Sequence, residues 1–352
     1  MIGIIGGAGF IGRALVGELR NAGGEVRIID LQPPAAGEGE FVRADVRDRA
    51  ALTAALAGCG IVYNLAAEHR DDVRPVSLYQ EVNVGGAENT CAAAEAHGIE
   101  RIVFASSVAI YGAAERELDE DAPPRPFNEY GRTKLEAETV FEAWVRRAPE
   151  RSLSVVRPTV VFGPGNRGNV YQLLDQIARG RSVIIGDGRN RKSMAYVDNV
   201  AAFLAHVRDR GPGPHAYNYV DKPDLDMNRL IALATETLGR DPRASRRIPY
   251  PLGLAAGLAA DLVAAATGRS LPVSAVRVRK FCANTQFANR RALATGFVPR
   301  VPLEDALRAT IRHEFGAPEP TPAPPGASRS PDRAGIGTPD EMTERAVPIR
   351  SR

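Results

Sequence analysis

The stretch MIGIIGGAGFIGRALVGEL (residues 1–19) joins a short apolar run, a glycine-rich turn and a segment with helical periodicity. Gly6, Gly9 and Gly12 would allow a tight turn, a close approach of the backbone to a pyrophosphate, and close packing of the helix on the strand. The pattern predicts a strand, turn and helix that bind the phosphates of a dinucleotide at the helix N-terminus.

A second strand-like run, residues 25–29, ends at Asp30. An acid about 20 residues beyond the glycine turn commonly takes the ribose hydroxyls of the cofactor. Its charge would repel a 2′-phosphate, and no Arg or Lys follows in residues 31–34 to bind one. NAD is therefore expected rather than NADP. Asp is also common where a loop begins, so a purely local role for Asp30 is the alternative.

Short apolar runs recur along the first half of the chain, with helical stretches between most of them. They cover residues 1–5, 25–29, 40–42, 61–65, 101–105 and 153–156. This rhythm predicts an α/β fold, a Rossmann-type doubly wound parallel sheet with a smaller C-terminal substrate-binding lobe. Residues 1–160 are expected to form mainly the NAD-binding domain and 161–315 mainly the lobe, with segments returning to the sheet. Residues 317–352, rich in Pro, Gly, Ser and charge, are expected to be a disordered tail.

Composition narrows the function class. The 352 residues are 44% hydrophobic and carry a formal charge of +3, which is small for this length and does not call for a nucleic-acid partner. The three cysteines are widely separated, so no metal site is expected and a reducing cytoplasm fits best. The apolar stretch 251–268 is short and interrupted by Asp261, which predicts a packed helix and no membrane span; a loose contact with a membrane surface is the alternative.

The run Tyr130-Gly131-Arg132-Thr133-Lys134 puts a phenol and an ammonium one helical turn apart. A phenol is a poor base at neutral pH, and a cation beside it favours the phenolate. Such pairs are also common on exposed helix faces, so the spacing alone proves little. A buried strand that ends at Ser106-Ser107 would bring a hydroxyl to the edge of the sheet where doubly wound folds bind ligands.

Together these motifs make residues 1–315 resemble the extended short-chain dehydrogenase/reductase family, in its NAD-dependent epimerase/dehydratase branch, which includes UDP-galactose 4-epimerase. The resemblance implies that Tyr130 is the acid/base, that Lys134 lowers its pKa and holds the nicotinamide ribose, and that Ser107 is the third catalytic residue. Further matches imply cofactor contacts along the chain. The whole cofactor set is Gly6, Gly9, Phe10, Ile11, Gly12, Asp30, Asp45, Val46, Leu65, Ala66, Ala67, Asn83, Ser106, Tyr130, Lys134, Pro158 and Val160.

Substrate contacts are less sharply indicated. His69 and Arg70 follow the fourth strand, where the family places a substrate-facing loop. The family's late basic position matches Lys192, or Arg191 if the alignment shifts by one place, and Arg279 belongs to a basic cluster that could bind a diphosphate. Solvated loop and helix surfaces explain the same residues equally well or better.

The resemblance implies a nucleotide-sugar epimerase, acting at C4 through a transient keto-sugar, as a cytoplasmic homodimer. Dehydratases of the family carry an Asp-Glu pair where this chain has Val108 and Ala109, which argues against elimination chemistry. An oxidoreductase of a sugar or other secondary alcohol is the alternative enzyme. A non-catalytic NAD-binding regulator is a third hypothesis, disfavoured because Tyr130, Lys134 and Ser107 are all present.

Overall fold

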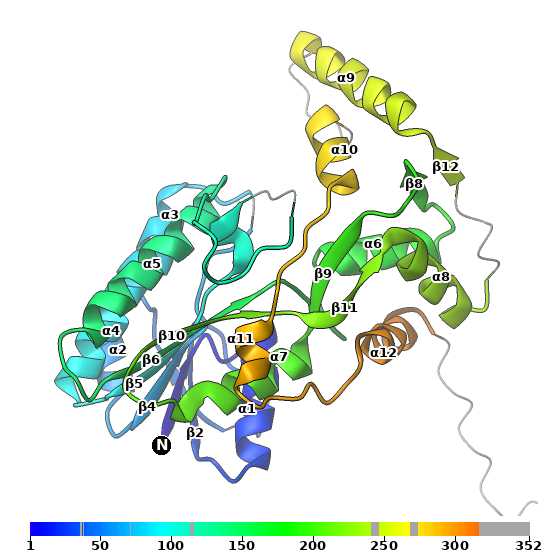
Figure 1. Cartoon of the computed structure of the whole chain (residues 1–352). Coiled ribbons are helices and arrows are strands. Elements are labelled where there is room, and N and C mark those ends of the chain that lie inside the picture. The colour runs from blue at the N-terminus through cyan, green and yellow to red at the C-terminus, as the bar shows by residue number, and fades with distance from the viewer. Residues whose placement is uncertain are drawn as a thin grey trace, which may run out of the picture. The chain divides into compact units, whose positions relative to one another are not determined.

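The computed structural model describes residues 1–35, 37, 39–70, 72–112, 116–240, 246–267 and 274–316; the predicted tail lies outside them. Its centre is a parallel sheet of seven strands in the order β10-β6-β5-β4-β1-β2-β3 (Figure 1). The strands are β1 (Ile2–Ile5), β2 (Val26–Asp30), β3 (Glu40–Arg43), β4 (Ile61–Asn64), β5 (Arg101–Ala105), β6 (Ser152–Pro158) and β10 (Gly213–Tyr219). The predicted Rossmann-type sheet is confirmed.

Helices cover both faces of this sheet because successive strand residues point to opposite sides. In β1, Ile4 packs into one core and Ile5 into the other. The first core lies under α1 (Phe10–Asn21) and α7 (Val197–His206). The second lies under α2 (Arg49–Ala55), α4 (Gly86–Ala96) and α5 (Glu129–Val145), with the short α3 (Ser77–Tyr79) and π-helical η1 (Gln80–Gly85) leading into α4.

The later half of the chain builds two smaller sheets and a third core. Strands β7 (Val160–Phe162), β9 (Arg191–Tyr196) and β11 (Asp221–Asp226) form one, and β8 (Val183–Ile185) pairs with β12 (Arg246–Ile248) in the other. The core is closed by α6 (Asn169–Ala178), α8 (Met227–Thr237) and α12 (Leu303–Phe315). The remaining helices are α9 (Tyr250–Thr267), α10 (Ala275–Cys282), α11 (Arg290–Ala294) and the 3₁₀ turns η2 (Val108–Tyr111) and η3 (Val207–Asp209).

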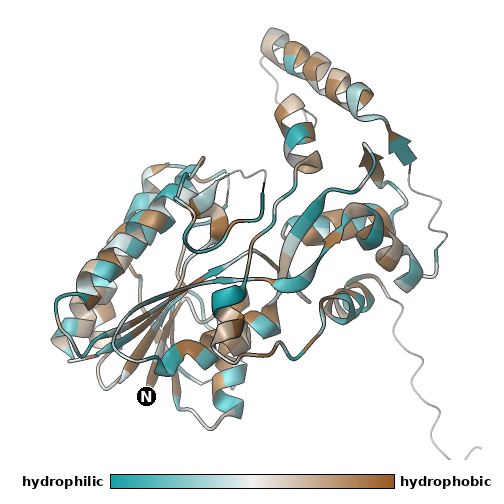
Figure 2. Ribbon diagram, in the orientation of Figure 1, coloured by the Kyte–Doolittle hydropathy of each residue, from teal (hydrophilic) through white to brown (hydrophobic). Residues whose placement is uncertain are grey.

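Helix α9 corrects one expectation. The stretch is a helix as predicted, yet it is packed only along one side. Leu252 and Leu262 are 63% and 73% exposed, and Figure 2 colours much of the α9 ribbon as hydrophobic. Among the described residues, no helix is long and apolar enough to cross a membrane.

Candidate active site

The glycine turn is a close-packed junction between β1, α1 and the segment after β4. Gly6 has a φ of +79°, and a Cβ there would lie 2.6 Å from the amide nitrogen of Ala66. A Cβ on Gly12 would lie 2.3 Å from the carbonyl oxygen of Gly6. Both positions therefore require glycine, which lets the turn pack directly against the backbone of Leu65 and Ala66; Ala67 follows them in the chain.

The start of α1 fits a dinucleotide. Within the described chain, no side chain caps the amides of its first turn, and that turn contains no acid, so its positive end is available to an anion. Beside it, the Asp30 carboxylate accepts hydrogen bonds from the amides of Ala8 at 3.0 Å and Leu31 at 2.7 Å. Phosphates at the helix end and ribose hydroxyls at Asp30 are the two groups that this arrangement can hold.

Substituting Asp30 by Asn tests the cofactor choice. Asparagine keeps an oxygen acceptor for Ala8 but removes the charge, so NAD affinity should fall about tenfold and the preference over NADP should shrink. Titrating the purified variant with each dinucleotide measures both. An unchanged ratio of the two affinities, in a variant with normal thermal stability, would remove Asp30 from the cofactor site.

Helix α5 carries Tyr130 toward the end of β5. Asn128 caps the helix by accepting a hydrogen bond from the amide of Gly131 at 2.9 Å. The Tyr130 side chain is hydrogen-bonded to Ser107, and the catalytic roles of the two residues stay predictions. Burial raises the pKa of Tyr130 and the Ser107 hydrogen bond opposes the rise. The net shift in this structure is upward.

Lys134 is buried one turn further along α5. Its ammonium donates to the carbonyl oxygen of Ala105 at 2.7 Å and lies 4.5 Å from the ring centre of Phe104. Burial lowers the pKa of Lys134 to about 7, with the charge of Glu138 acting in the other direction. The ammonium is thus held beside the end of β5. Its action on Tyr130 and on a ribose stays a prediction.

A buried network beneath Lys134 was missed by the sequence analysis. Arg157 donates to both carboxylate oxygens of Glu138, at 2.9 and 2.6 Å, and to the hydroxyl of Tyr111 at 2.7 Å. Ser106 also donates to Glu138, and Tyr111 donates to Asn218. The network fixes the end of β5 against α5, and Ser106 takes part in it. The predicted contact of Ser106 with the cofactor stays a prediction. No local sequence pattern signals this network, because Arg157 lies on a strand and Glu138 on a helix.

Gly131 sets how closely α5 approaches the turn that contains Ser107. A Cβ on Gly131 would lie 2.4 Å from the carbonyl oxygen of Ala109. We expect Gly131→Ala to push the helix away, to cost about 1–3 kcal/mol of stability and to lower turnover as Tyr130 moves. Gly17→Ala in α1 is the control, since nothing lies within 4 Å of the added Cβ and helix propensity predicts a gain of up to about 1 kcal/mol. Thermal unfolding and steady-state assays compare them; equal behaviour would refute the packing argument.

The other predicted cofactor residues surround the same edge of the large sheet. Asn83 is buried, accepts from the amide of Glu68 at 2.9 Å and donates to Thr133 at 2.9 Å, so it joins the segment after β4 to α5. Asp45 is paired with Arg47, which lowers its pKa. The remaining members of the set lie at the start of α1, after β3 and at the end of β6 or in β7: Phe10, Ile11, Val46, Pro158 and Val160.

The predicted substrate residues fall into two groups. His69 and Arg70 are exposed, with Arg70 paired to Glu68 at 3.5 Å. Lys192 donates to the carbonyl oxygen of Ala283 at 2.6 Å, and Arg279 lines a pocket of about 450 Å³ that also includes Ala283. The structure therefore brings Lys192 and Arg279 to one region of the later half. Neither Tyr130 nor Ser107 lines that pocket.

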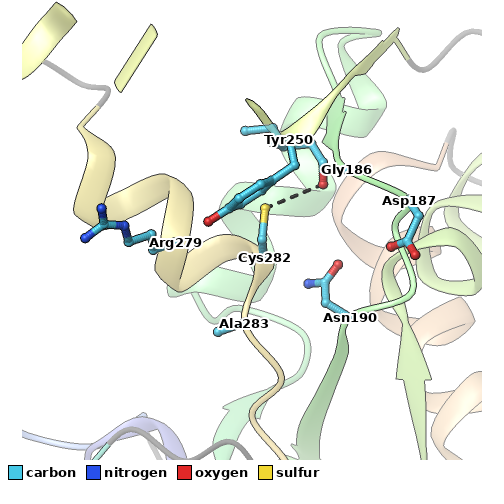
Figure 3. Close-up of a pocket in the computed structure, with 8 residues that line it drawn as sticks. Gly186, Asp187, Asn190, Tyr250, Arg279, Cys282 and Ala283 are labelled. Atoms are coloured by element: carbon cyan, nitrogen blue, oxygen red, sulfur yellow. Dashed lines mark hydrogen bonds between the residues drawn. The ribbon is translucent and has the colours of Figure 1, made fainter. Parts of the chain in front are cut away.

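The pocket lies between the β8–β9 turn and helices α9 and α10. Figure 3 shows Tyr250, from the start of α9, beside Cys282 at the end of α10, with Asp187 and Asn190 across from them. The thiol of Cys282 donates to the carbonyl oxygen of Ile185 at 3.5 Å. The full lining is Ile185, Gly186, Asp187, Asn190, Tyr250, Arg279, Cys282 and Ala283.

Residues 2–219 match the model of the NAD dependent epimerase/dehydratase family. This match covers more than half of the chain. The chain belongs to this family. It is an enzyme family that uses NAD, in agreement with the cofactor predicted from Asp30 and with the fit of the glycine turn.

Individual members of the NAD dependent epimerase/dehydratase family show how far the likeness extends. The chain is 46% identical over 314 residues to the N-acetyl-alpha-D-glucosaminyl-diphospho-ditrans,octacis-undecaprenol 4-epimerase of Escherichia coli O157:H7, covering 89% of this chain and 94% of that protein. The structure of MoeE5 with UDP-glucose and NAD is 29% identical, with a TM-score of 0.69, and covers 89% of this chain and 97% of MoeE5. The UDP-glucose 4-epimerase of Thermus thermophilus, 22% identical with a TM-score of 0.69 and covering 89% and 98%, shares the fold.

Proposed function

We propose that the protein is an NAD-dependent 4-epimerase of a sugar carried on a polyprenyl diphosphate, with N-acetylglucosamine as the sugar. The observation that carries this proposal is the 46% identity, over nearly the whole of both chains, to an epimerase whose name specifies that substrate. This replaces the nucleotide carrier of the sequence-based prediction with a lipid carrier, while the sugar chemistry stays the same.

The side chains at the end of β5 would perform the proton transfers of this reaction. Tyr130 would take the proton of the C4 hydroxyl and later return it, while Ser107, to which it is hydrogen-bonded, would hold the same oxygen. Bound NAD supplies the acceptor and donor of the hydride. If the Lys134 ammonium acts on this oxygen when the dinucleotide is bound, it would favour the phenolate and offset the effect of burial on the pKa of Tyr130.

Inversion requires the sugar to present its other face before hydride returns, so the sugar pocket must allow rotation while the diphosphate stays held. Lys192 and Arg279 are the proposed diphosphate partners, because the structure brings both to the pocket region beside Ala283. Cations grip a diphosphate without restricting the sugar beyond it. In this proposal residues 1–160 mainly hold NAD, and residues 161–315 mainly hold the carrier.

A nucleotide carrier is the second candidate, favoured by the likeness to MoeE5, whose structure contains UDP-glucose. The test is to incubate purified protein with N-acetylglucosamine linked either to undecaprenyl diphosphate or to UDP. Conversion to N-acetylgalactosamine on the lipid carrier, without accumulation of reduced nicotinamide, is the expected result. Conversion on UDP alone would identify the nucleotide carrier, and accumulating NADH would identify a dehydrogenase.

The proposal also includes the oligomeric state and the cellular compartment of the protein. Family resemblance implies a homodimer in which helices flanking the Tyr130 motif pack between subunits, in the cytoplasm. Sedimentation of the purified protein tests the dimer, and a monomer at assay concentrations would overturn it.

A further inference from the structure

Helix α9 presents an apolar surface that the rest of the described chain does not cover. Among its 18 residues, Asp261 is the one charged residue. Leu252, Leu258, Leu262 and Val263 are each at least 49% exposed. Large apolar side chains gathered on one exposed helix face mark an interaction site.

The opposite side of α9 is fixed to its neighbours by small residues. A Cβ on Gly253 would lie 2.7 Å from Cγ2 of Ile185, and one on Gly257 would lie 2.7 Å from the amide nitrogen of Ala275. Asp261 continues this side, since its carboxylate accepts from the same amide at 3.0 Å. The helix therefore has a defined orientation: Gly253, Gly257 and Asp261 face inward, and the exposed leucines named above face outward.

Positive charge lies on the two elements next to α9. Strand β12 contributes Arg246 and Arg247, and α10, which packs along α9 (Figure 1), contributes Arg277 and Arg279. Neither element contains an acidic residue. An apolar helix face with arginines on the neighbouring elements is complementary to a bilayer surface that contains anionic lipid.

The face also adjoins the pocket proposed to hold the diphosphate. Tyr250, the first residue of α9, lines that pocket together with Arg279 of α10 (Figure 3). We propose that the outer face of α9 lies on the membrane surface, so that the adjoining pocket receives the diphosphate of a substrate whose polyprenyl chain stays in the bilayer. This inference rests on the proposed function, in which the sugar carrier is a lipid.

A second copy of the chain is the competing occupant of this face. The four arginines on the flanking elements, Arg246, Arg247, Arg277 and Arg279, would repel their counterparts across a twofold interface, whereas an anionic bilayer would attract them. The charge distribution therefore favours the membrane, and the oligomeric state becomes an outcome of the test.

The experiment is flotation of the full chain with vesicles of phosphatidylcholine, with and without phosphatidylglycerol. Wild type should float with the anionic vesicles, and the double variant Leu258→Gln, Leu262→Gln should lose binding by about tenfold or more. The matched control is Leu293→Gln with Val298→Gln, because those side chains are also exposed and apolar but lie outside α9. It should bind as wild type does.

Turnover separates this inference from the proposed function. The α9 variant should epimerise a short-chain, water-soluble isoprenyl diphosphate sugar at the wild-type rate, and should lose activity on the long-chain substrate in vesicles. The membrane assignment would be overturned if the wild-type protein failed to float with the anionic vesicles. It would also be overturned if the wild-type protein were a dimer and the α9 variant a monomer. Normal flotation with no turnover of either lipid substrate would uphold the surface and remove the proposed substrate.

Discussion

Replacing Tyr130 with phenylalanine is expected to lower epimerase turnover by about 10²–10⁴-fold, the usual contribution of a positioned acid/base. The change removes the hydroxyl that is hydrogen-bonded to Ser107 and leaves the ring in place, so the fold and the bound NAD should be retained. Turnover on the polyprenyl-linked sugar, with the dinucleotide content of the purified protein, measures both effects.

Tyr171→Phe is the matched control. Tyr171 stacks on Phe315 with ring centres 5.5 Å apart and lies on α6, outside the predicted site. Its loss of a hydroxyl should leave turnover within about twofold of wild type, as expected of a substitution outside the site. Near-normal activity of the Tyr130 variant would show that another group carries the proton.

Replacing Glu138 with alanine is expected to destabilise the protein by about 3–5 kcal/mol, because it leaves the buried Arg157 guanidinium without its carboxylate. Glu138 and Arg157 are 2% and 7% exposed and form a two-pronged ion pair. Chemical denaturation of the variant gives the change in unfolding free energy.

Two further variants locate the cause. Glu142→Ala, one turn along α5, breaks an exposed pair with Arg146 at 2.9 Å and should cost less than about 1 kcal/mol. Glu138→Leu combined with Arg157→Met should recover much of the loss, since both buried charges are then gone. A double variant as unstable as Glu138→Ala would mean that packing, and not the unpaired charge, sets the cost.

The large sheet could be predicted because six of its strands are short apolar runs separated by helical segments. The seventh could not: β10 contains Pro214 and His215 and lies at the edge of the sheet, where one side needs no partner strand. The exposure of helix α9 could not be predicted, for a different reason. Its composition correctly indicated a helix, but an apolar sequence looks the same whether the helix is buried or covered by something outside the chain.

In the candidate site, too, some features could be predicted from local sequence patterns and others could not. The glycines of the turn, Asp30 and the spacing of Tyr130 from Lys134 are local patterns, and the structure places them on the predicted elements. The pair of Arg157 with Glu138 joins residues from a strand and a helix and has no local signature. Likewise, position 131 requires glycine because a Cβ there would clash with the carbonyl oxygen of Ala109. Ala109 lies 22 residues earlier in the chain, so the local sequence does not reveal this clash.

The position of β10 has a consequence for synthesis and engineering. Strand β6 pairs with β5 on one side and with β10 on the other, and β10 belongs to the part of the chain that follows the small sheet strand β7. Until β10 has been synthesised and has left the ribosome, β6 is the edge strand of the nascent sheet. Its unpaired backbone groups can then pair with a strand of another chain. A fragment cut at the boundary between the NAD-binding half and the lobe would keep that edge permanently. The minimal independently expressed cofactor domain must therefore include the segment through Tyr219.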